Sequence, residues 1–456
     1  MRLSRRSLLV GSTALVMASR AARSSDRRVL RLESRTIDVN GRPATRYRVV
    51  QSSGAWGLTL DQGEMFDVRL ENRLSVPSSV HWHGMNPPWR QDGVPFLSAP
   101  PIAPGQAAEY TFPAVPVGTR WMHSHFGLQE QNLLAAPLIV REQSAISSGL
   151  QEVVVMFEDF SWTSPREIFA SLRKPKPMNM ASMGSSVPDL NDVTYDAFLA
   201  NDRTLADPQV IDVEKGGEIR LRLINAAAST NFMIELGELD GRVLTVDGNP
   251  VRPLEVRRFP LAVAQRVDIA LRLPAGAATA LPVLARGEGR RLQAGVLLRP
   301  AGAAVAKIPE TAAAPAPAIG LAEELQLRAE APLAARPVDR SVPVDLTGDM
   351  AGYVWGMSVH GMEGLPVTVA KGERVELVMR NATMMSHPMH LHGHSFQVTE
   401  INGQVLAGAV RDTILVPPRT TAKVVFDADN PGLWAYHCHN LYHMAAGMMT
   451  VVEYVG

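Results

Sequence analysis

A pattern that occurs three times along the chain restricts the fold more than any other feature. In each copy a Gly is followed by alternating apolar and polar residues and then, nine positions on, by Asn: GEMFDVRLEN (63–72), GGEIRLRLIN (216–225) and GERVELVMRN (372–381). The third, fifth and seventh residues after each Gly are apolar, and this period of two is typical of a half-buried strand entered through a turn. Because the copies lie roughly 155 residues apart, the sequence predicts three copies of one β domain.

The composition agrees with a β-rich globular protein. The chain of 456 residues is 46% hydrophobic and 20% charged, with 35 Gly and 33 Pro to make chain reversals. Lys plus Arg balance Asp plus Glu at 45 each, so a nucleic acid or another charge-driven partner is not expected. We predict a β-sandwich in each domain, one short helix near 321–330, and these divisions: domains at 23–147, 148–305 and 336–456, with an extended surface linker at 306–335.

The first 22 residues have the features of an export signal. Arg5 and Arg6 precede an apolar run from Leu8 to Ala18 and then small residues. The run is too short to span a bilayer and resembles a twin-arginine signal, which predicts recognition by that export machinery and a periplasmic or secreted protein. A short membrane anchor or a disordered basic tail are the alternatives. No other segment approaches 18 uninterrupted apolar residues, so membrane insertion is not expected.

Histidines follow the repeat. Five His-x-His pairs occur among only 12 His, and HWHG and HLHG each begin nine residues after the repeat Asn of the first and third copies, where the middle copy has Ile234 and Leu236. HSH and HCH occupy a second pair of equivalent positions. On a strand, residues i and i+2 share a face, so four pairs could present eight imidazoles to about three metal ions between domains one and three. Copper, zinc and iron all suit imidazole. The eight residues are His81, His83, His123, His125, His390, His392, His437 and His439.

The single cysteine points to copper. It excludes an intrachain disulfide, and because Cys438 lies between His437 and His439, its side chain should point away from theirs. On that face it could meet His387, His443 and Met448. Two imidazoles, one thiolate and a thioether are the ligand set of a blue-copper electron-transfer site.

Together the motifs HWHG, HSH, HPMHLHG and HCHNLYHMAAGM resemble those of multicopper oxidases, the family of laccases and bacterial cuprous oxidases. The resemblance covers nearly the whole mature chain. It implies an all-β fold of three consecutive cupredoxin-like Greek-key β-sandwich domains, with a middle domain free of copper. It also implies four copper ions, with all ten family His positions filled.

The resemblance assigns each ligand. A type 1 copper would be held by His387, Cys438, His443 and Met448. A type 2 copper would be held by His81 and His390, and a type 3 pair by two sets of three: His83, His123 and His439; and His125, His392 and His437.

Several residues near these motifs have less definite roles. Asp92, in RQDGVP, matches the family's proton-relay Asp near the type 2 copper, although Asp-Gly is also a common hairpin turn. Met444 stands where some metal-oxidising relatives have Glu, which puts a second carboxylate relay in doubt. We predict that His394 supports the ligands or is structural, and we assign no role to His360.

The resemblance implies an oxidase that oxidises a small reductant one electron at a time and reduces O2 to water, with Asp92 and Cys438 as its catalytic residues. We expect laccase-like activity on phenols and aromatic amines. The alternative is a metallo-oxidase acting on Cu(I), Fe(II) or Mn(II) in copper tolerance, and a non-catalytic binding protein is the third reading. Because one chain supplies every ligand, a monomer suffices.

Methionine clusters bear on this choice, because thioethers prefer Cu(I) but also fill irregular apolar gaps. The better candidate for Cu(I) delivery is the loop KPKPMNMASMG, and the second is near 350–362. They contain Met178, Met180 and Met183, and Met350, Met357 and Met362.

Overall fold

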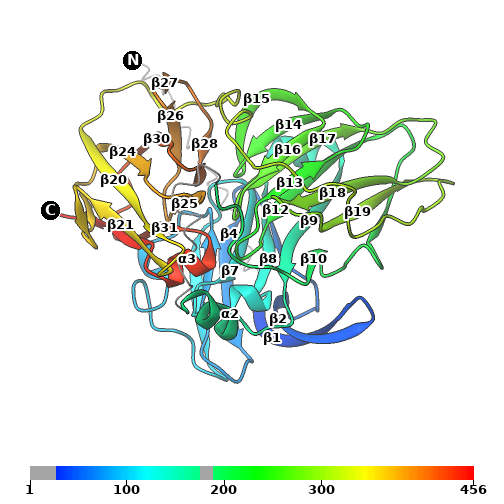
Figure 1. Cartoon of the computed structure of the whole chain (residues 1–456), viewed down its shortest axis with the longest axis horizontal. Coiled ribbons are helices and arrows are strands. Elements are labelled where there is room, and N and C mark those ends of the chain that lie inside the picture. The colour runs from blue at the N-terminus through cyan, green and yellow to red at the C-terminus, as the bar shows by residue number, and fades with distance from the viewer. Residues whose placement is uncertain (1–26, 175–187) are drawn as a thin grey trace, which may run out of the picture.

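The computed structural model describes residues 27–174 and 188–456, which form three β lobes in chain order (Figure 1). In Figure 1 the first lobe runs from blue to cyan, the second is green, and the third runs from yellow to red. Each lobe contains two sheets. Helices in the described residues are short, and none is long and apolar enough to cross a membrane.

The first lobe combines two sheets of four strands. In spatial order, one contains β2 (Arg42–Gln51), β1 (Arg28–Val39), β4 (Met65–Asn72) and β6 (Ala107–Pro113). The other contains β3 (Leu58–Asp61), β8 (Ala135–Arg141), β7 (Gly118–Ser124) and β5 (Val80–His83). Short helical segments lie after three of these strands: η1 (Trp89–Gln91) after β5, η2 (Glu130–Asn132) after β7 and α1 (Gln143–Ser148) after β8.

The second lobe has a six-stranded and a five-stranded sheet. The first contains β10 (Ala197–Ala200), β9 (Gln151–Phe160), β12 (Glu218–Asn225), β17 (Arg266–Arg272), β14 (Gly241–Val246) and β15 (Asn249–Val256). The second contains β11 (Val210–Val213), β19 (Gln293–Pro300), β18 (Leu281–Gly287), β13 (Phe232–Glu235) and β16 (Arg258–Leu261). Helix α2 (Pro165–Leu172) follows β9 and begins with a capping box between Ser164 and Glu167.

The third lobe repeats this arrangement. Its larger sheet contains β22 (Met362–Glu363), β21 (Val354–Val359), β20 (Arg340–Asp349), β24 (Arg374–Asn381), β30 (Thr421–Asp427), β26 (Phe396–Ile401) and β27 (Gln404–Val405), with β28 (Val410–Arg411) also paired to β26. Its smaller sheet contains β23 (Val367–Val369), β32 (Met449–Tyr454), β31 (Leu433–Cys438), β25 (His387–Leu391) and β29 (Thr413–Val416). Helix α3 (Leu441–Ala445) follows β31.

The repeated segments occupy equivalent strands, as the sequence predicts. β4, β12 and β24 each pair in parallel with the first long strand of their lobe and antiparallel with a later strand. Their alternating apolar residues are buried in three separate cores, one for each lobe. The alternating apolar residues of the repeat therefore form the buried face of the equivalent strand in each of the three lobes.

The Asn that ends each repeat holds a corner of its sandwich. Asn225 donates from Nδ2 to the carbonyl oxygens of Thr230 and Leu261, both at 2.9 Å, and accepts from the backbone N–H of Ala227 at 3.0 Å. Asn72 and Asn381 make the same three kinds of bond in the other lobes. In each lobe two carbonyls thus gain a buried side-chain donor, which explains why one amide side chain recurs.

Two local predictions differ from the structure. Residues 321–330 form turns rather than a helix, although Leu325 N–H bonds the Leu321 carbonyl at 2.9 Å. Tertiary contacts override helix propensity here, because Leu327 is buried in the middle core and Glu324 pairs with Arg411. The Ala/Pro-rich segment contains no strand from 301 to 335, but it is not wholly superficial, since Ile319 packs between the second and third lobes.

Candidate metal centre

The four His-x-His pairs begin on two pairs of hydrogen-bonded strands, one in the first lobe and one in the third, and the second His of three of them lies just past the strand end. β5 pairs with β7 so that His81 faces His123 in register. β25 pairs with β31 so that His390 faces His437. The two strand pairs therefore bring eight imidazoles together from opposite ends of the chain.

These imidazoles form three groups, and each group joins the first and third lobes. Within each, the candidate ligand atoms all lie within 4.8 Å of one another, and every residue is buried. Group A is His81, His83 and His390; group B is His83, His123 and His439; group C is His125, His392 and His437. Groups B and C contain the two sets of three that the resemblance assigns to the type 3 pair, and group A contains the two His assigned to the type 2 ion together with His83, which it shares with group B.

Hydrogen bonds fix which ring nitrogen of each group A imidazole faces the group. Nδ1 of His81 lies 3.0 Å from the Asp92 carbonyl oxygen, and Nδ1 of His390 lies 2.8 Å from that of Asp412. Their Nε2 atoms are buried without a hydrogen-bond partner, and so is Nδ1 of His83, whose Nε2 lies 3.1 Å from Asp412 Oδ1. Each ring is therefore anchored by one nitrogen and leaves the other free, as a metal ligand requires.

The free nitrogens approach one another closely. Nε2 of His437 lies 3.0 Å from Nε2 of His392 and 3.4 Å from Nε2 of His125, and the Nε2 atoms of His123 and His439 are also 3.4 Å apart. Ligands about 2.0 Å from one tetrahedral ion are about 3.3 Å from each other. The spacing in groups B and C fits nitrogens that share a cation.

Burial and electrostatics favour neutral rings at this interface. Desolvation, followed by the neighbouring imidazoles, lowers the pKa of His83, His123, His390 and His392 well below the usual range. The pKa of His437 falls to about 4, chiefly through burial. Neutral imidazole is the form that binds a metal, so these nitrogens carry available lone pairs at neutral pH.

A fourth group surrounds the only cysteine. Cys438 Sγ lies 3.7 Å from Nδ1 of His387 and 3.7 Å from Nδ1 of His443, and those two nitrogens are 3.1 Å apart. Burial raises the pKa of the Cys438 thiol well above its usual range, so a thiolate here requires a cation beside it. Met448 is fully buried in the same core, and its carbonyl accepts the Cys438 N–H at 3.1 Å. One sulfur and two imidazoles, with Met448 buried in the same core, suit copper.

The outer nitrogens of this fourth group meet two polar residues that the sequence did not reveal. His387 Nε2 lies 2.7 Å from Thr383 Oγ1, and His443 Nε2 lies 3.4 Å from Asp192 Oδ2. The Asp192 carboxylate also accepts a hydrogen bond from the Tyr353 hydroxyl. His443 is thus linked to a carboxylate of the middle lobe.

Three buried carboxylates support the imidazole groups. Asp92, the predicted one, places Oδ2 2.8 Å from His392 Nδ1 and Oδ1 3.1 Å from His81 Nδ1. Glu130 Oε2 lies 2.8 Å from His123 Nδ1, and burial raises the pKa of its carboxyl well above the usual range. Asp412 contacts His83 and His390 as described above. Glu130 and Asp412 escaped sequence analysis because neither belongs to a recognisable motif.

The remaining sequence candidates lie elsewhere. His394 is a supporting residue, since its Nδ1 lies 3.0 Å from the His392 carbonyl and its Nε2 2.6 Å from the Tyr454 hydroxyl. His360 is exposed in the turn between β21 and β22. In the second Met cluster, Met357 is part of the third core whereas Met362 is exposed. The first Met cluster and residues 1–22 lie outside the described residues.

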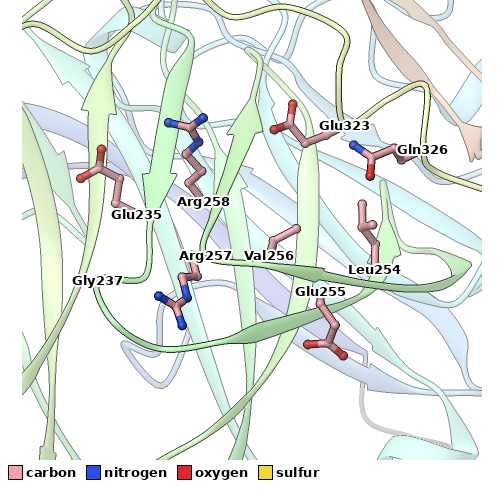
Figure 2. A pocket seen from close by; sticks show the side chains of 9 residues that line it. All are labelled: Glu235, Gly237, Leu254, Glu255, Val256, Arg257, Arg258, Glu323 and Gln326. Carbon is pink, nitrogen blue, oxygen red and sulfur yellow. The ribbon is translucent and has the colours of Figure 1, made fainter.

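A surface hollow of about 420 Å³ on the second lobe differs from the candidate metal centre in the side chains that line it (Figure 2). Its charged lining, which includes Glu235, Arg257, Arg258 and Glu323, comes from β13, the β15–β16 edge and the turn near 323. No histidine or cysteine lines it, so it offers none of the soft or imidazole ligands gathered between the first and third lobes.

Comparison with known proteins agrees with this geometry. Family models described as multicopper oxidase match residues 47–145, 152–291 and 335–455. The multicopper oxidase MmcO of Mycobacterium tuberculosis is 32% identical over 98% of this chain and 91% of its own. Copper resistance protein A of Escherichia coli is 27% identical over 86% of each chain.

Solved structures share the fold. The crystal structure of Fet3p, described as a multicopper oxidase that functions in iron import, superposes with a TM-score of 0.77 at 20% identity, covering 93% of this chain and 90% of its own. The predicted all-β fold of three cupredoxin-like domains is therefore confirmed. With matches to all three of its lobes and a relative above 30% identity along almost its entire length, this chain belongs to the multicopper oxidase family, whose members are oxidoreductases.

Proposed function

We propose that this oxidoreductase removes single electrons from a reductant at the Cys438 group and uses four of them, with four protons, to reduce O2 to two waters at groups A, B and C. One observation carries the proposal. Cys438 lies between His437 of group C and His439 of group B, so the sulfur is joined to both groups by a short run of covalent bonds.

We assign four copper ions to the four groups. His387, Cys438, His443 and Met448 would hold the type 1 ion, and the unpartnered Nε2 atoms of His81 and His390 would hold the type 2 ion. Groups B and C would hold the type 3 pair. Bound copper would supply reversible one-electron chemistry, so that four ions together can store the four electrons that O2 requires.

The surrounding residues would position ligands and deliver protons. Asp92 accepts from His392 Nδ1 while its own carbonyl anchors His81, so it touches both lobes. We propose that the Asp92 carboxylate hands protons to the oxygen-reducing site. Its position after η1 and before Gly93, at φ +82°, also supports the turn interpretation, and the two roles are compatible.

For the reductant we propose phenols and aromatic amines first. A second candidate, a metal cation such as Cu(I), Fe(II) or Mn(II), is favoured by the relatives named copper resistance protein A and by Asp192, whose carboxylate lies beside His443 Nε2. We further propose that the protein is a monomer, since one chain supplies every ligand. We also propose that it is exported through the twin-arginine signal described above.

Copper analysis and one substitution test the site. We expect about four coppers per chain and a blue absorption band in the loaded protein, and Cys438→Ser should remove the band, one copper and substrate oxidation. Met389→Leu is the matched control, because Met389 pairs with Cys438 across β25 and β31 and is equally buried. A blue Cys438→Ser variant would contradict the assignment.

Oxygen uptake separates the two substrate classes. The loaded protein should consume O2 with a substituted phenol, with Cu(I), or with both. If a cation is the substrate, Asp192→Asn should raise KM for Cu(I) at least tenfold while changing KM for the phenol far less, because the phenol carries no positive charge for the carboxylate to attract. Equal changes would exclude Asp192 as a cation-selecting group.

A further inference from the structure

An arginine of the middle lobe reaches the interface between the other two. Arg266, the first residue of β17, is fully buried and grips the Asp412 carboxylate with two bonds, Nη1 to Oδ1 at 2.8 Å and Nη2 to Oδ2 at 2.5 Å. Its three other N–H groups donate to the carbonyl oxygens of Thr119 at 3.3 Å, Ala264 at 3.0 Å and Asp247 at 3.3 Å. All five donors of a guanidinium are thus used, and its orientation is fixed.

Asp412 in turn contacts two imidazoles and holds their orientation. Its Oδ1 lies 3.1 Å from His83 Nε2, and its carbonyl oxygen lies 2.8 Å from His390 Nδ1. The neighbouring Thr413 hydroxyl donates to Asp412 Oδ1 at 2.9 Å. One residue therefore anchors a ring from the first lobe and a ring from the third, and both rings belong to group A.

The Arg266 guanidinium and the Asp412 carboxylate are tightly packed against their neighbours. A Cβ atom on Gly84, which directly follows His83, would lie 2.7 Å from Arg266 Nη2 and 2.8 Å from Asp412 Oδ2. Arg120 lies on the same side, with Nη1 3.6 Å from Asp412 Oδ2. The carboxylate is held between two buried guanidinium groups and the glycine of the HWHG motif.

We propose that Arg266 is a positioning residue for the type 2 copper site, acting through Asp412, so that the middle lobe, none of whose described residues belongs to groups A, B or C, sets the geometry of a site built from the other two. This inference rests on the proposed function, which makes His81 and His390 the type 2 ligands and His83 a ligand of the adjacent pair. The bidentate fork is what the role requires, because a planar pair of N–H groups fixes both the position and the plane of a carboxylate.

Arg266→Lys tests the role, since it keeps the charge and removes the fork. Arg222→Lys is the matched control: Arg222 is also fully buried in the middle lobe and pairs with Asp268, Glu152 and Thr119, none of which contacts a proposed ligand. For each copper-loaded variant we would measure copper per chain during dialysis against a chelator, the electron paramagnetic resonance of type 2 copper, and the blue band. Unfolding in urea monitors general destabilisation.

We expect Arg266→Lys to lose type 2 copper at 10–100-fold lower chelator concentration than wild type and to change the type 2 resonance, with the blue band retained. Arg222→Lys should resemble wild type in all three. Wild-type behaviour of Arg266→Lys, or equal losses in both variants, would overturn the proposal.

If Arg266→Lys yields no folded protein, Asp412→Asn replaces it with the same readouts and the same deciding outcomes, because it keeps the side-chain volume and weakens the same link. A wild-type chain that binds no copper would instead refute the proposed function, so the two failures are distinguishable.

Discussion

Replacing Gly84 by Ala adds one methyl group at a tightly packed point of the interface between the lobes. The new Cβ would lie 2.7 Å from Arg266 Nη2, 2.8 Å from Asp412 Oδ2 and 2.9 Å from Arg120 Cδ, and the backbone there has φ +83°. These neighbours cannot move aside cheaply, because every donor of Arg266 is already bonded. The substitution therefore combines backbone strain with overpacking.

The two contributions can be separated by magnitude. A left-handed backbone costs a residue with a Cβ about 1–2 kcal/mol, and inserting a methyl into a packed interior costs about 1–3 kcal/mol. Gly84→Ala should thus lower the free energy of unfolding by about 2–5 kcal/mol. Gly63→Ala provides the matched control, because Gly63 has φ +91° with no atom within 4 Å of the added Cβ, and it should cost only the backbone share.

The assay is urea unfolding of the copper-loaded protein, followed by tryptophan fluorescence, with a common slope for the two variants. Gly84→Ala should unfold at lower urea than Gly63→Ala by the equivalent of about 1–3 kcal/mol. It should also disturb the type 2 resonance, which Gly63→Ala should leave unchanged. Equal midpoints would show that Arg266 and Asp412 can yield, and would refute the reasoning that they are immobile.

Three other substitutions test separate features. Burial raises the pKa of the Glu158 carboxyl well above its usual 4.5, so the fold keeps a proton that the unfolded chain releases, and stability falls as pH rises above that value, by up to about 1.4 kcal/mol per pH unit. Glu158→Gln should make the fall in stability between pH 5 and 7 shallower than in the wild type, although buried Glu130 still contributes a fall of its own, and an unchanged slope in urea unfolding would argue against this role of Glu158. Asn225→Ala should cost about 3 kcal/mol or more in the same assay, because two buried carbonyls lose their donor; a loss below 1 kcal/mol would contradict the corner role. Asp92→Asn should slow O2 reduction about 100-fold in stopped-flow reoxidation while retaining the blue band, and an unchanged rate would exclude the proton role.

Local patterns in the sequence carry much of the fold and of the site. The repeat predicts β4, β12 and β24, because alternation along one strand reports directly on its buried face. The His-x-His pairs predict which imidazoles share a face, because residues two apart on a strand point the same way. Both signals lie within ten residues, so the sequence displays them without knowledge of the fold.

The supporting residues could not be read in this way. Asp412 meets His83 across 329 positions of sequence, and Arg266 meets Asp412 across 146, so no local pattern marks either contact. Single acidic residues such as Glu130 resemble surface residues until the fold buries them. The false helix at 321–330 has the same origin, because its residues favour a helix locally while their partners in the second and third lobes hold them in turns.

Groups A, B and C each draw imidazoles from both ends of the chain, and this has a consequence for biosynthesis. The ligands from the third lobe, which begin at His390, come more than 260 residues after the last ligand of the first lobe, His125, so none of the three groups can be complete before the third lobe has been made. Metal captured by the early pairs alone would have two imidazoles at most per strand and would exchange readily. Copper insertion is therefore expected as a late event, after the third lobe has been made and has docked on the first.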